Sequence, residues 1–248
     1  MWSAAALLAL TLAVQTPAQP DPATTAWPDD QPISRLFQNL GADLAALPTV
    51  ENAAIVGLGG LGALVVHPVD DDLATWAMEA GPSSYTSFGR DFGSGGVQIG
   101  AAVVAYVIGR TQQNAPVTHV ASDLIRAQAL NTVITTGLKY TVRRARPGDG
   151  SRTSFPSGHT SSTFASAAVL QSHFGWKVGG PAYALAGFVG WTRVRDHVHF
   201  LSDVVMGAAL GTMAGRTVTI GHRERVWRVV PTKTPGGVAV YVVRTAGR

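Results

Sequence analysis

The chain has 248 residues, a formal net charge of +4, 14% charged residues and no cysteine. This length suffices for one substantial domain with a buried core, and the lack of cysteine excludes disulfides, thiolate catalysis and cysteine-ligated metal sites. Much of the basic charge lies between Lys139 and Arg152. It is not spread along a face with interleaved aromatic residues, as on a nucleic-acid-binding surface, so we expect no nucleic-acid partner.

Residues 1–18 are typical of an export signal, because an apolar run (4–14) is followed by small residues suited to cleavage. No Lys or Arg precedes this run, so a frayed hydrophobic helix or an uncleaved anchor is the alternative. The Pro- and Asp-rich residues 19–32 predict an extended linker. We expect an exported protein of the cell envelope or periplasm, either membrane-associated with an outward-facing site or soluble.

Residues 33–222 predict an all-α helical bundle, because apolar residues recur with helical period in a chain rich in Gly and Ala. Residues 223–248 form a separate extension, in which two β-branched runs (226–230 and 238–243) flank a Pro- and Gly-containing turn and predict a small β-hairpin. The loop at 81–96 carries no motif. The predicted helices cover residues 33–47, 53–66, 70–79, 97–109, 117–140, 160–174, 182–191 and 201–218.

Whether these helices cross a bilayer is left open by the sequence. A spanning helix needs about 20 predominantly apolar residues, and the charge-free windows at 52–69 and 92–109 are shorter than that. On the other hand, the predicted helix at 53–66 is apolar all round and must be buried in lipid or in a protein core. The abundant Gly and Ala suit close helix packing in either medium.

A first basic cluster contains Lys139 and Arg146, seven residues apart and followed by Pro147. On a helix this spacing is nearly two turns, so both side chains would project from one face and reach the same anion. A solvated basic helix end is the alternative. Arg143, Arg144 and Arg152 are expected at the surface or rim.

A second cluster, Pro156-Ser157-Gly158-His159, predicts a tight turn that leads into a helix. Unpaired N–H groups at a helix N-terminus attract anions, and a glycine there lets the anion approach the backbone. His159 would be placed to donate a proton to a leaving oxygen, because its ordinary pKa is near neutrality. An ordinary capped helix with a surface histidine is the alternative.

A third cluster contains Arg193, His199 and Asp203. The four-residue spacing of His199 and Asp203 would stack them on a helix, so that the carboxylate fixes one ring nitrogen and leaves the other free to attack. Arg193 would add a third cation. A surface His–Asp pair is the alternative, and a metal pair of His197 and His199 lacks a further ligand at a suitable spacing. We therefore predict no metal ligand here.

Together the clusters resemble the type 2 phosphatidic acid phosphatase (PAP2) superfamily, which also includes bacterial acid phosphatases and vanadium haloperoxidases. The family pattern is Lys-x6-Arg-Pro, then Pro-Ser-Gly-His, then Ser-Arg-x5-His-x3-Asp. The one departure is Thr192 in place of Ser, which preserves the hydroxyl. The matching residues are Lys139, Arg146 and Pro147, then Pro156 to His159, then Arg193, His199 and Asp203.

The resemblance implies an all-α fold and a site in which His199 forms a phosphohistidine. Asp203 would orient His199, and His159 would protonate the leaving alcohol and then activate water. The phosphate would be held by Lys139, Arg146, Ser157, Gly158 and Arg193, with no metal cofactor and with vanadate as an inhibitor. The other histidines (His67, His119, His173, His197 and His222) are expected to be structural or at the surface.

The sequence favours a phosphatase acting on a phosphomonoester or on a lipid phosphate or pyrophosphate. A vanadate-dependent haloperoxidase using the same pocket is the alternative, although such relatives are expected to be longer. A third possibility is a non-enzymatic membrane or binding protein that retains a phosphate pocket. The sequence does not determine the substrate or the oligomeric state.

Overall fold

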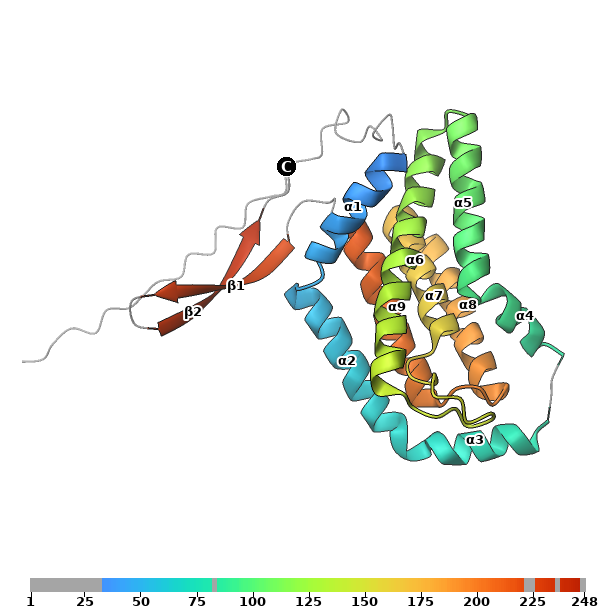
Figure 1. The fold of residues 1–248 in the computed structure, drawn as a ribbon. Coiled ribbons are helices and arrows are strands. Elements are labelled where there is room, and N and C mark those ends of the chain that lie inside the picture. Colours follow the sequence, from blue (N-terminus) through green and yellow to red (C-terminus); the bar gives the residue numbers. More distant parts are fainter. Residues whose placement is uncertain (1–32, 82–83, 221–225, 235–236, 246–248) are drawn as a thin grey trace, which may run out of the picture.

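The computed structural model describes residues 33–81, 84–220, 226–234 and 237–245. The predicted all-α architecture is confirmed, because the described residues up to 220 fold into helices that run mostly lengthwise in a bundle (Figure 1). The predicted signal (1–18) and linker (19–32) lie outside the described residues. The α-helices are α1 (Ile33–Ala45), α2 (Val50–Val66), α3 (Asp70–Glu79), α4 (Thr86–Phe92), α5 (Gly95–Thr111), α6 (Ala115–Val142), α7 (Gly158–Phe174), α8 (Trp176–Arg195) and α9 (Leu201–Ile220), with a 3-10 turn, η2 (His67–Val69), between α2 and α3.

Two strands follow the bundle, β1 (Val226–Thr234) and β2 (Gly237–Thr245). They pair antiparallel, with Val226 opposite Thr245. The fold is defined by the helices alone, and the C-terminal hairpin stays a prediction.

The centre of the bundle is the contact between α7 and α9, which run side by side with α6 and α8 around them (Figure 1). Small residues allow the close approach: a Cβ on Gly211 would lie 2.0 Å from the Ser161 carbonyl oxygen, and one on Gly215 would lie 2.5 Å from the Ala165 carbonyl oxygen. No side chain larger than hydrogen fits at these two positions without moving α7. The glycines of α9 therefore set its distance from α7.

Apolar side chains fill the space between these helices. Leu130, Val169 and Val218 are fully buried and come from α6, α7 and α9. Burying a Val or Leu side chain contributes about 1.5–3 kcal/mol relative to leaving it exposed. This cluster ties the three helices together along their length.

Several helices begin where a polar side chain can accept a hydrogen bond from the first turn. Thr49 accepts from the Asn52 N–H before α2, Ser94 from Val97 before α5, and Asn114 from Val117 before α6. Such capping satisfies N–H groups that have no partner inside the helix. It also explains why the helices begin two or three residues earlier than the apolar pattern predicts.

Two segments differ from the prediction. Residues 81–96 were expected to be a loop but contain the short helix α4. The helix predicted at 182–191 begins already at Trp176, because Pro181 is accommodated inside α8. A proline inside a helix removes one backbone hydrogen bond, and α8 nevertheless continues through it.

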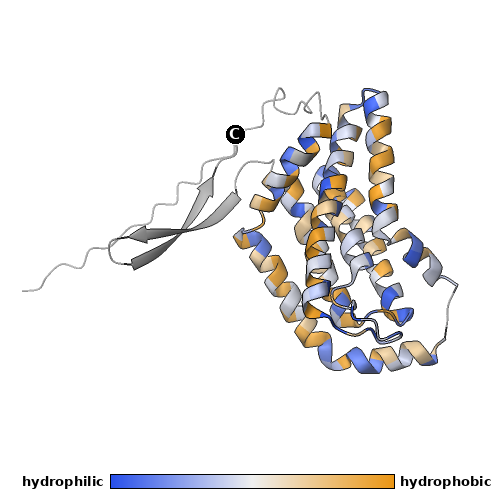
Figure 2. Ribbon diagram, viewed as in Figure 1, coloured by the Kyte–Doolittle hydropathy of each residue, from blue (hydrophilic) through white to orange (hydrophobic). Residues whose placement is uncertain are grey.

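The outer faces of α2 and α5 are strongly apolar (Figure 2). On α2, Leu58, Leu61, Leu64 and Val65 are each more than 60% exposed. The stretch Val50–Glu79 is long and apolar enough to cross a membrane, and only 17% of its most apolar window is buried in the molecule. The bent pair Thr86–Phe92 and Gly95–Thr111, with an angle of 56°, would be a second candidate if it acts as one span.

Candidate active site

The three sequence clusters meet at one end of the bundle, where α6 ends and α7 and α9 begin (Figure 1). The Ser157 N–H donates to the Asp203 backbone carbonyl at 3.0 Å, which joins the start of α7 to the start of α9. A Cβ on Gly158 would lie 3.8 Å from the Lys139 Cε, so the end of α6 reaches the same place. The predicted convergence of the clusters is therefore present in the fold.

His199 lies in the connection between α8 and α9 and is 3% exposed. Its Nδ1 is 3.6 Å from the Asp203 Oδ2, longer than a normal hydrogen bond, and has no hydrogen-bond partner among the described residues. Because α9 begins only at Leu201, the pair is not stacked on one helix as predicted. Asp203 nevertheless faces Nδ1, which leaves Nε2 on the other side of the ring.

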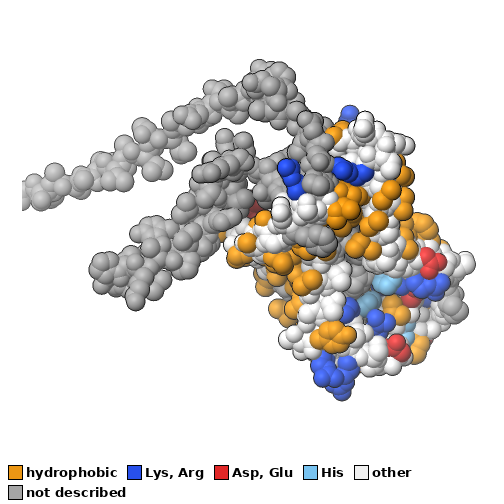
Figure 3. Space-filling view, turned by 45° about the horizontal axis from the view of Figure 1, so that its top comes forward, with side chains coloured by type: hydrophobic (Ala, Val, Ile, Leu, Met, Phe, Trp, Pro, Cys, Tyr) orange, Lys and Arg blue, Asp and Glu red, His pale blue; other side chains and the backbone are white. Residues whose placement is uncertain are grey.

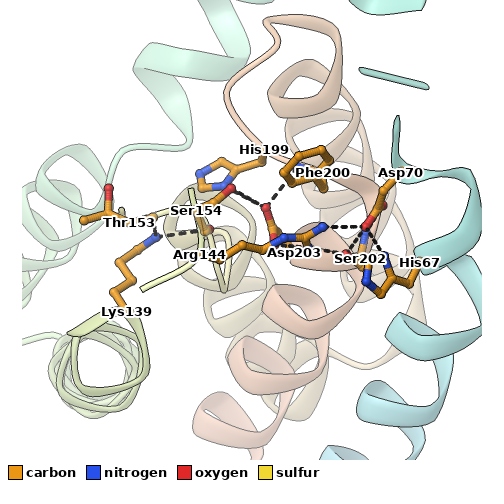
Figure 4. Close-up of polar contacts among 10 residues, drawn as sticks. All are labelled: His67, Asp70, Lys139, Arg144, Thr153, Ser154, His199, Phe200, Ser202 and Asp203. Carbon is orange, nitrogen blue, oxygen red and sulfur yellow. Dashed lines mark hydrogen bonds and ion pairs between the residues drawn. The ribbon is translucent and has the colours of Figure 1, made fainter. Parts of the chain in front are cut away.

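Asp203 is fully buried, and its carboxylate is held by several donors (Figure 4). The Ser154 hydroxyl (2.5 Å) and the Phe200 N–H (2.9 Å) donate to Oδ2, and Arg144 donates to Oδ1 at 2.8 Å. Burial alone would raise the pKa of this carboxyl, but these donors and the neighbouring His199 outweigh it and hold the pKa below its ordinary value. Asp203 is therefore an anion with a fixed orientation.

Arg144 is part of the candidate site, whereas the sequence analysis placed it at the surface or rim. Its guanidinium donates to Asp203 and Ser202 through Nη1 and to the Asp70 Oδ2 through Nη2 at 2.9 Å, and it stacks 4.0 Å from the centre of the Phe200 ring (Figure 4). By contrast, Arg143 and Arg152 are exposed, as expected. The position of Arg144 follows from where α6 ends, which a run of arginines in the sequence does not reveal.

Asp70 is also part of this network, although the sequence analysis assigned it no role. It is 1% exposed and accepts hydrogen bonds from the Ser202 N–H (3.0 Å) and hydroxyl, while Asp71 and Asp72 face outward. Arg144 thus bridges two buried carboxylates, Asp70 at the start of α3 and Asp203 in α9. This bridge ties α3 to the site.

Lys139 and Arg146 reach the site from different elements. The predicted single helix through both is wrong: α6 ends at Val142, Arg143 takes a left-handed conformation (φ 52°), and Arg146 lies in the loop that follows. Lys139 donates to the Thr153 carbonyl in that loop. The Arg146 Nε is buried without a hydrogen-bond partner among the described residues, an unfavourable state that an anionic ligand would relieve.

Arg193 lies at the end of α8 and is 3% exposed. Its guanidinium donates to Asp196 at 2.7 Å and to the Thr192 hydroxyl at 3.1 and 3.2 Å. Thr192, which replaces a serine of the motif, therefore uses its hydroxyl to position the arginine. A Cβ on Gly89 would lie 2.2 Å from that hydroxyl oxygen, so α4 packs directly on it.

Ser157, Gly158 and His159 form the start of α7, with Ser157 as its N-cap residue. Ser157 is fully buried and its hydroxyl oxygen accepts from Thr160 at 2.9 Å. Gly93, just after α4, comes so close that a Cβ on it would lie 3.3 Å from the His159 Cβ. His159 thus lies between the site and the connection of α4 to α5.

The charges at this end of the bundle influence one another. Burial, Arg193 and His199 lower the pKa of His159 to about 4, and burial together with Arg146 lowers the pKa of Lys139 to about 8. Burial also lowers the pKa of His199, against the opposing effect of Asp203. Both histidines are therefore neutral at pH 7 in the absence of a ligand, within a group of cations that attracts an anion.

On the face drawn in Figure 3, the His side chains lie toward the lower right, with Lys, Arg, Asp and Glu side chains around them. Further Lys and Arg side chains lie near the top, and hydrophobic side chains lie in between.

An apolar cavity of about 260 Å³ lies between α5, α7 and α8. Thr163, one turn after His159, and Phe92, next to Gly93, are among its lining residues. The cavity therefore begins beside the predicted proton donor. Its other lining residues are Val97, Gln98, Ala101, Ala102, Leu124, Ser166, Ala167, Leu170, Ala182, Leu185 and Ala186.

Of the remaining histidines, His67 and His197 lie near the candidate site without forming part of it. His67 contacts Asp70 at 3.3 Å from an exposed position, and His197 packs against Gly148. Within the described ranges, the one group of three side chains suited to a metal is His119, Asp123 and His173, and it does not include His197 or His199. His222 lies outside the described residues.

The match to a family model covers residues 120–227 and is to the PAP2 superfamily. All three clusters lie within the matched residues. The resemblance to this superfamily that the three clusters predicted is therefore confirmed over residues 120–227.

Two curated PAP2 relatives match parts of the chain. The lipid A 1-phosphatase of Porphyromonas gingivalis is 34% identical over 99 residues, and the lipid A 4'-phosphatase of Helicobacter pylori is 26% identical over 118 residues. The matches cover 38% and 42% of this chain. The chain spans only 22% and 60% of these relatives' own lengths.

Two solved structures share the fold. The crystal structure of Aquifex aeolicus LpxE has a TM-score of 0.50 and 25% identity, covering 60% of this chain and 94% of that one. The transmembrane PAP2-type phosphatidylglycerolphosphate phosphatase from Bacillus subtilis has a TM-score of 0.52 and 20% identity, covering 75% of this chain and 92% of that one. The second likeness concerns the fold alone.

Proposed function

We propose that the protein is a phosphatase that hydrolyses a phosphate ester on a lipid through a phosphohistidine intermediate. The observation that supports this most strongly is the meeting of a neutral, buried His199, its anionic partner Asp203, and the cations Lys139, Arg146 and Arg193 at one end of the bundle. A phosphoryl group needs this combination of nucleophile and fixed positive charge.

In the first step, the Nε2 of His199 attacks phosphorus while the P–O bond to the lipid breaks. Asp203 faces Nδ1 and stabilises the positive charge that develops on the ring. His159 gives a proton to the departing alcohol oxygen. Its pKa near 4 is a property of the ligand-free site, and a bound phosphate dianion offsets the repulsion from Arg193 and Arg146 and raises that pKa.

In the second step, water attacks the phosphohistidine and the P–N bond breaks. His159, left neutral by the first step, takes the proton from this water. Inorganic phosphate and free His199 result.

The phosphate oxygens would be held by Lys139, Arg146 and Arg193, by the Ser157 hydroxyl and by the Gly158 N–H at the start of α7. These groups supply charge stabilisation that a metal ion provides in other phosphoryl-transfer enzymes. We therefore propose that the reaction uses no metal cofactor and that vanadate inhibits it by occupying the same position.

The apolar cavity supports a lipid substrate. It begins one turn after His159 and is lined mostly by Ala and Leu side chains, a surface suited to an acyl chain attached to the departing alcohol. Both curated relatives are named as phosphatases of lipid A. A phosphorylated lipid A is accordingly the first substrate to test.

The apolar outer faces support a place in the membrane. Exposed leucines on α2 and exposed Val and Ile residues on α5 would contact lipid, and a site at one end of the bundle would then lie near the level of lipid headgroups. We propose an envelope protein with its site facing outward.

A substrate panel in detergent and in the aqueous fraction tests this function. Phosphorylated lipid A should be hydrolysed with a higher kcat/KM than p-nitrophenyl phosphate, with activity in the detergent fraction, inhibition by vanadate and no loss after brief exposure to EDTA. A strict requirement for an added divalent metal would contradict the proposed chemistry.

Nothing in the site favours the alternative of a vanadate-dependent haloperoxidase. Oxidation of bromide in the presence of vanadate and peroxide would reveal that activity.

The cavity is tested by Ala182→Phe, which narrows it, with Ala184→Phe as the control. Both positions are on α8, but Ala182 lines the cavity and Ala184 is exposed and does not. We expect Ala182→Phe to lower kcat/KM for the long-chain lipid about tenfold or more, equivalent to about 1.4 kcal/mol, and to spare p-nitrophenyl phosphate. An equal loss for both substrates would argue against an acyl-chain site.

A further inference from the structure

A second group of ionisable side chains lies at the opposite end of the bundle from the phosphate site. His119 and Asp123 are one turn apart near the start of α6, and His173 lies near the end of α7. Lys139 is 20 residues further along α6 than His119, a distance of about 30 Å at 1.5 Å per residue. This group therefore takes no part in the proposed phosphate chemistry.

The three side chains point at one another. The Asp123 Oδ2 is 2.8 Å from the His173 Nε2 and 3.7 Å from the His119 Nε2, and one ligand atom from each residue lies within 4.8 Å of those of the other two. The Asp123 side chain is 2% exposed, and those of His173 and His119 are 5% and 15% exposed. A partly accessible histidine leaves a path for a small ion.

Arg126 and Asp43 hold the Asp123 carboxylate in place. The Asp123 Oδ1 accepts a hydrogen bond from the Arg126 Nη2, and the Arg126 Nη1 donates to Asp43 of α1, both at 2.5 Å. Arg126 and Asp43 are each 2% exposed. This arrangement occupies Oδ1 and leaves Oδ2 for the two imidazoles, as the outer partners of metal-bound carboxylates do.

Two buried carboxylates, Asp43 and Asp123, share the guanidinium of Arg126. A divalent ion bound at the free oxygen of Asp123 would add positive charge beside these carboxylates.

We propose that His119, Asp123 and His173 bind a divalent transition-metal ion of the zinc type through two imidazoles and one carboxylate. These are ligands that zinc accepts, at about 2.0–2.2 Å. Tetrahedral bonds of that length separate neighbouring ligand atoms by about 3.3 Å, which lies between the two distances from Asp123 Oδ2. The ion would join α6 to α7 directly and to α1 through Arg126, and water would occupy the fourth position.

Zinc binding is measured on the full-length protein in detergent, after removal of any affinity tag and dialysis against a chelator. We expect one zinc ion per chain, and a loss of affinity of at least 100-fold in His119→Gln and in His173→Gln. His67→Gln is the matched control, since His67 is exposed and far from the group. A wild-type protein that binds no stoichiometric zinc, or variants that bind it unchanged, would overturn the proposal in favour of a protonated histidine.

Thermal unfolding gives an independent measurement. Saturating zinc at about 100 times its Kd should raise the Tm of the stripped protein by about 5–10 °C, and the shift should be absent in His119→Gln. If His173→Gln does not fold, the wild-type titration and His119→Gln still decide the question. The His199→Ala protein should bind zinc normally, so the outcome does not depend on the proposed phosphatase activity.

Discussion

Asp203 is oriented before any substrate binds, and most of that orientation comes from residues that do not contact phosphate. Ser154 and the Phe200 N–H fix one oxygen, and Arg144 fixes the other. Because Asp203 faces the His199 Nδ1, the position of the carboxylate determines the position of the ring. Arg144 is therefore a positioning residue that acts on His199 through Asp203.

Replacing Arg144 by Ala removes the shared partner of two buried carboxylates. Breaking a buried pair costs about 3–5 kcal/mol, and Arg144 is 23% exposed, so we expect the lower part of that range. We predict a Tm lower by about 6–12 °C and a kcat reduced about 10- to 100-fold, with KM nearly unchanged. Arg152→Ala, an exposed arginine of the same segment, should change neither; a rise in KM without a fall in kcat in Arg144→Ala would indicate a phosphate ligand instead.

The lowered pKa of Lys139 predicts an alkaline limit to activity. A lysine is charged below its pKa, so a pKa of about 8 in the free protein means that the cation is lost as the pH rises through 8. Since kcat/KM reports ionisations of the free enzyme, it should fall above about pH 8. Lys139→Arg should remove this limb at some loss of rate, and an unchanged limb would assign it to another group.

Among the individual residues of the candidate site, the sequence analysis singled out those whose spacing is fixed by the motif. It did not identify Arg144 or Asp70, because each lies beside similar residues that face solvent (Arg143, Asp71). Which one faces inward depends on where α6 ends and on how η2 leads into α3. Both features depend on tertiary packing, which leaves no periodic pattern in the sequence.

The helix pair α7–α9 holds two of the three clusters in place, and its spacing depends on glycine. A Cβ on Gly207 would lie 2.7 Å from the Ser157 carbonyl oxygen, one turn before the tight contact at Gly211. The Pro-Ser-Gly-His turn thus rests directly on α9. Small residues in α9 therefore determine the position of the proposed phosphate-binding groups in α7.

Gly211→Ala should disturb this contact. The added methyl would lie 2.0 Å from the Ser161 carbonyl oxygen, so the helices must separate, at a cost of about 1–3 kcal/mol. We expect a Tm lower by about 2–12 °C and reduced activity. Gly137→Ala is the control, since a Cβ there meets nothing within 4 Å; it should leave the Tm unchanged or slightly raised. Equal Tm values for the two variants would contradict the packing argument.

Helix content was predictable from the apolar pattern, but helix ends were less so. The predicted end of α6 at residue 140 is close to the observed end at Val142, but Arg146 was also expected on that helix, whereas Arg143 turns left-handed. In the proposed site, Lys139 and Arg146 would still reach one anion because the loop returns toward the helix, with the Ser154 N–H bonded to the Arg144 carbonyl at 3.0 Å. The geometric reason given for the first cluster was therefore wrong, and the joint role of Lys139 and Arg146 in binding an anion stays a prediction.

The whole molecule is a bundle with different chemistry at its two ends and an apolar outer face between them. The candidate phosphate site lies at one end, and the group of His119, Asp123 and His173 lies at the other. Helices α6 and α7 contribute to both. The sequence predicted the first end, whose residues form a family motif. It treated His119 and His173 as unrelated, because they are brought together only by the antiparallel packing of α6 and α7.

The central claim, that the clusters form one site around a nucleophilic His199, is tested most directly by trapping the intermediate. His159→Ala lacks the base for the second step but can still release an activated leaving group such as p-nitrophenol, so phosphoenzyme should accumulate. We predict radiolabelled phosphate on the peptide containing His199 after an alkaline quench, and none in His159→Ala/His199→Ala. Label on a different residue, or none while folded His159→Ala still releases p-nitrophenol, would contradict the account.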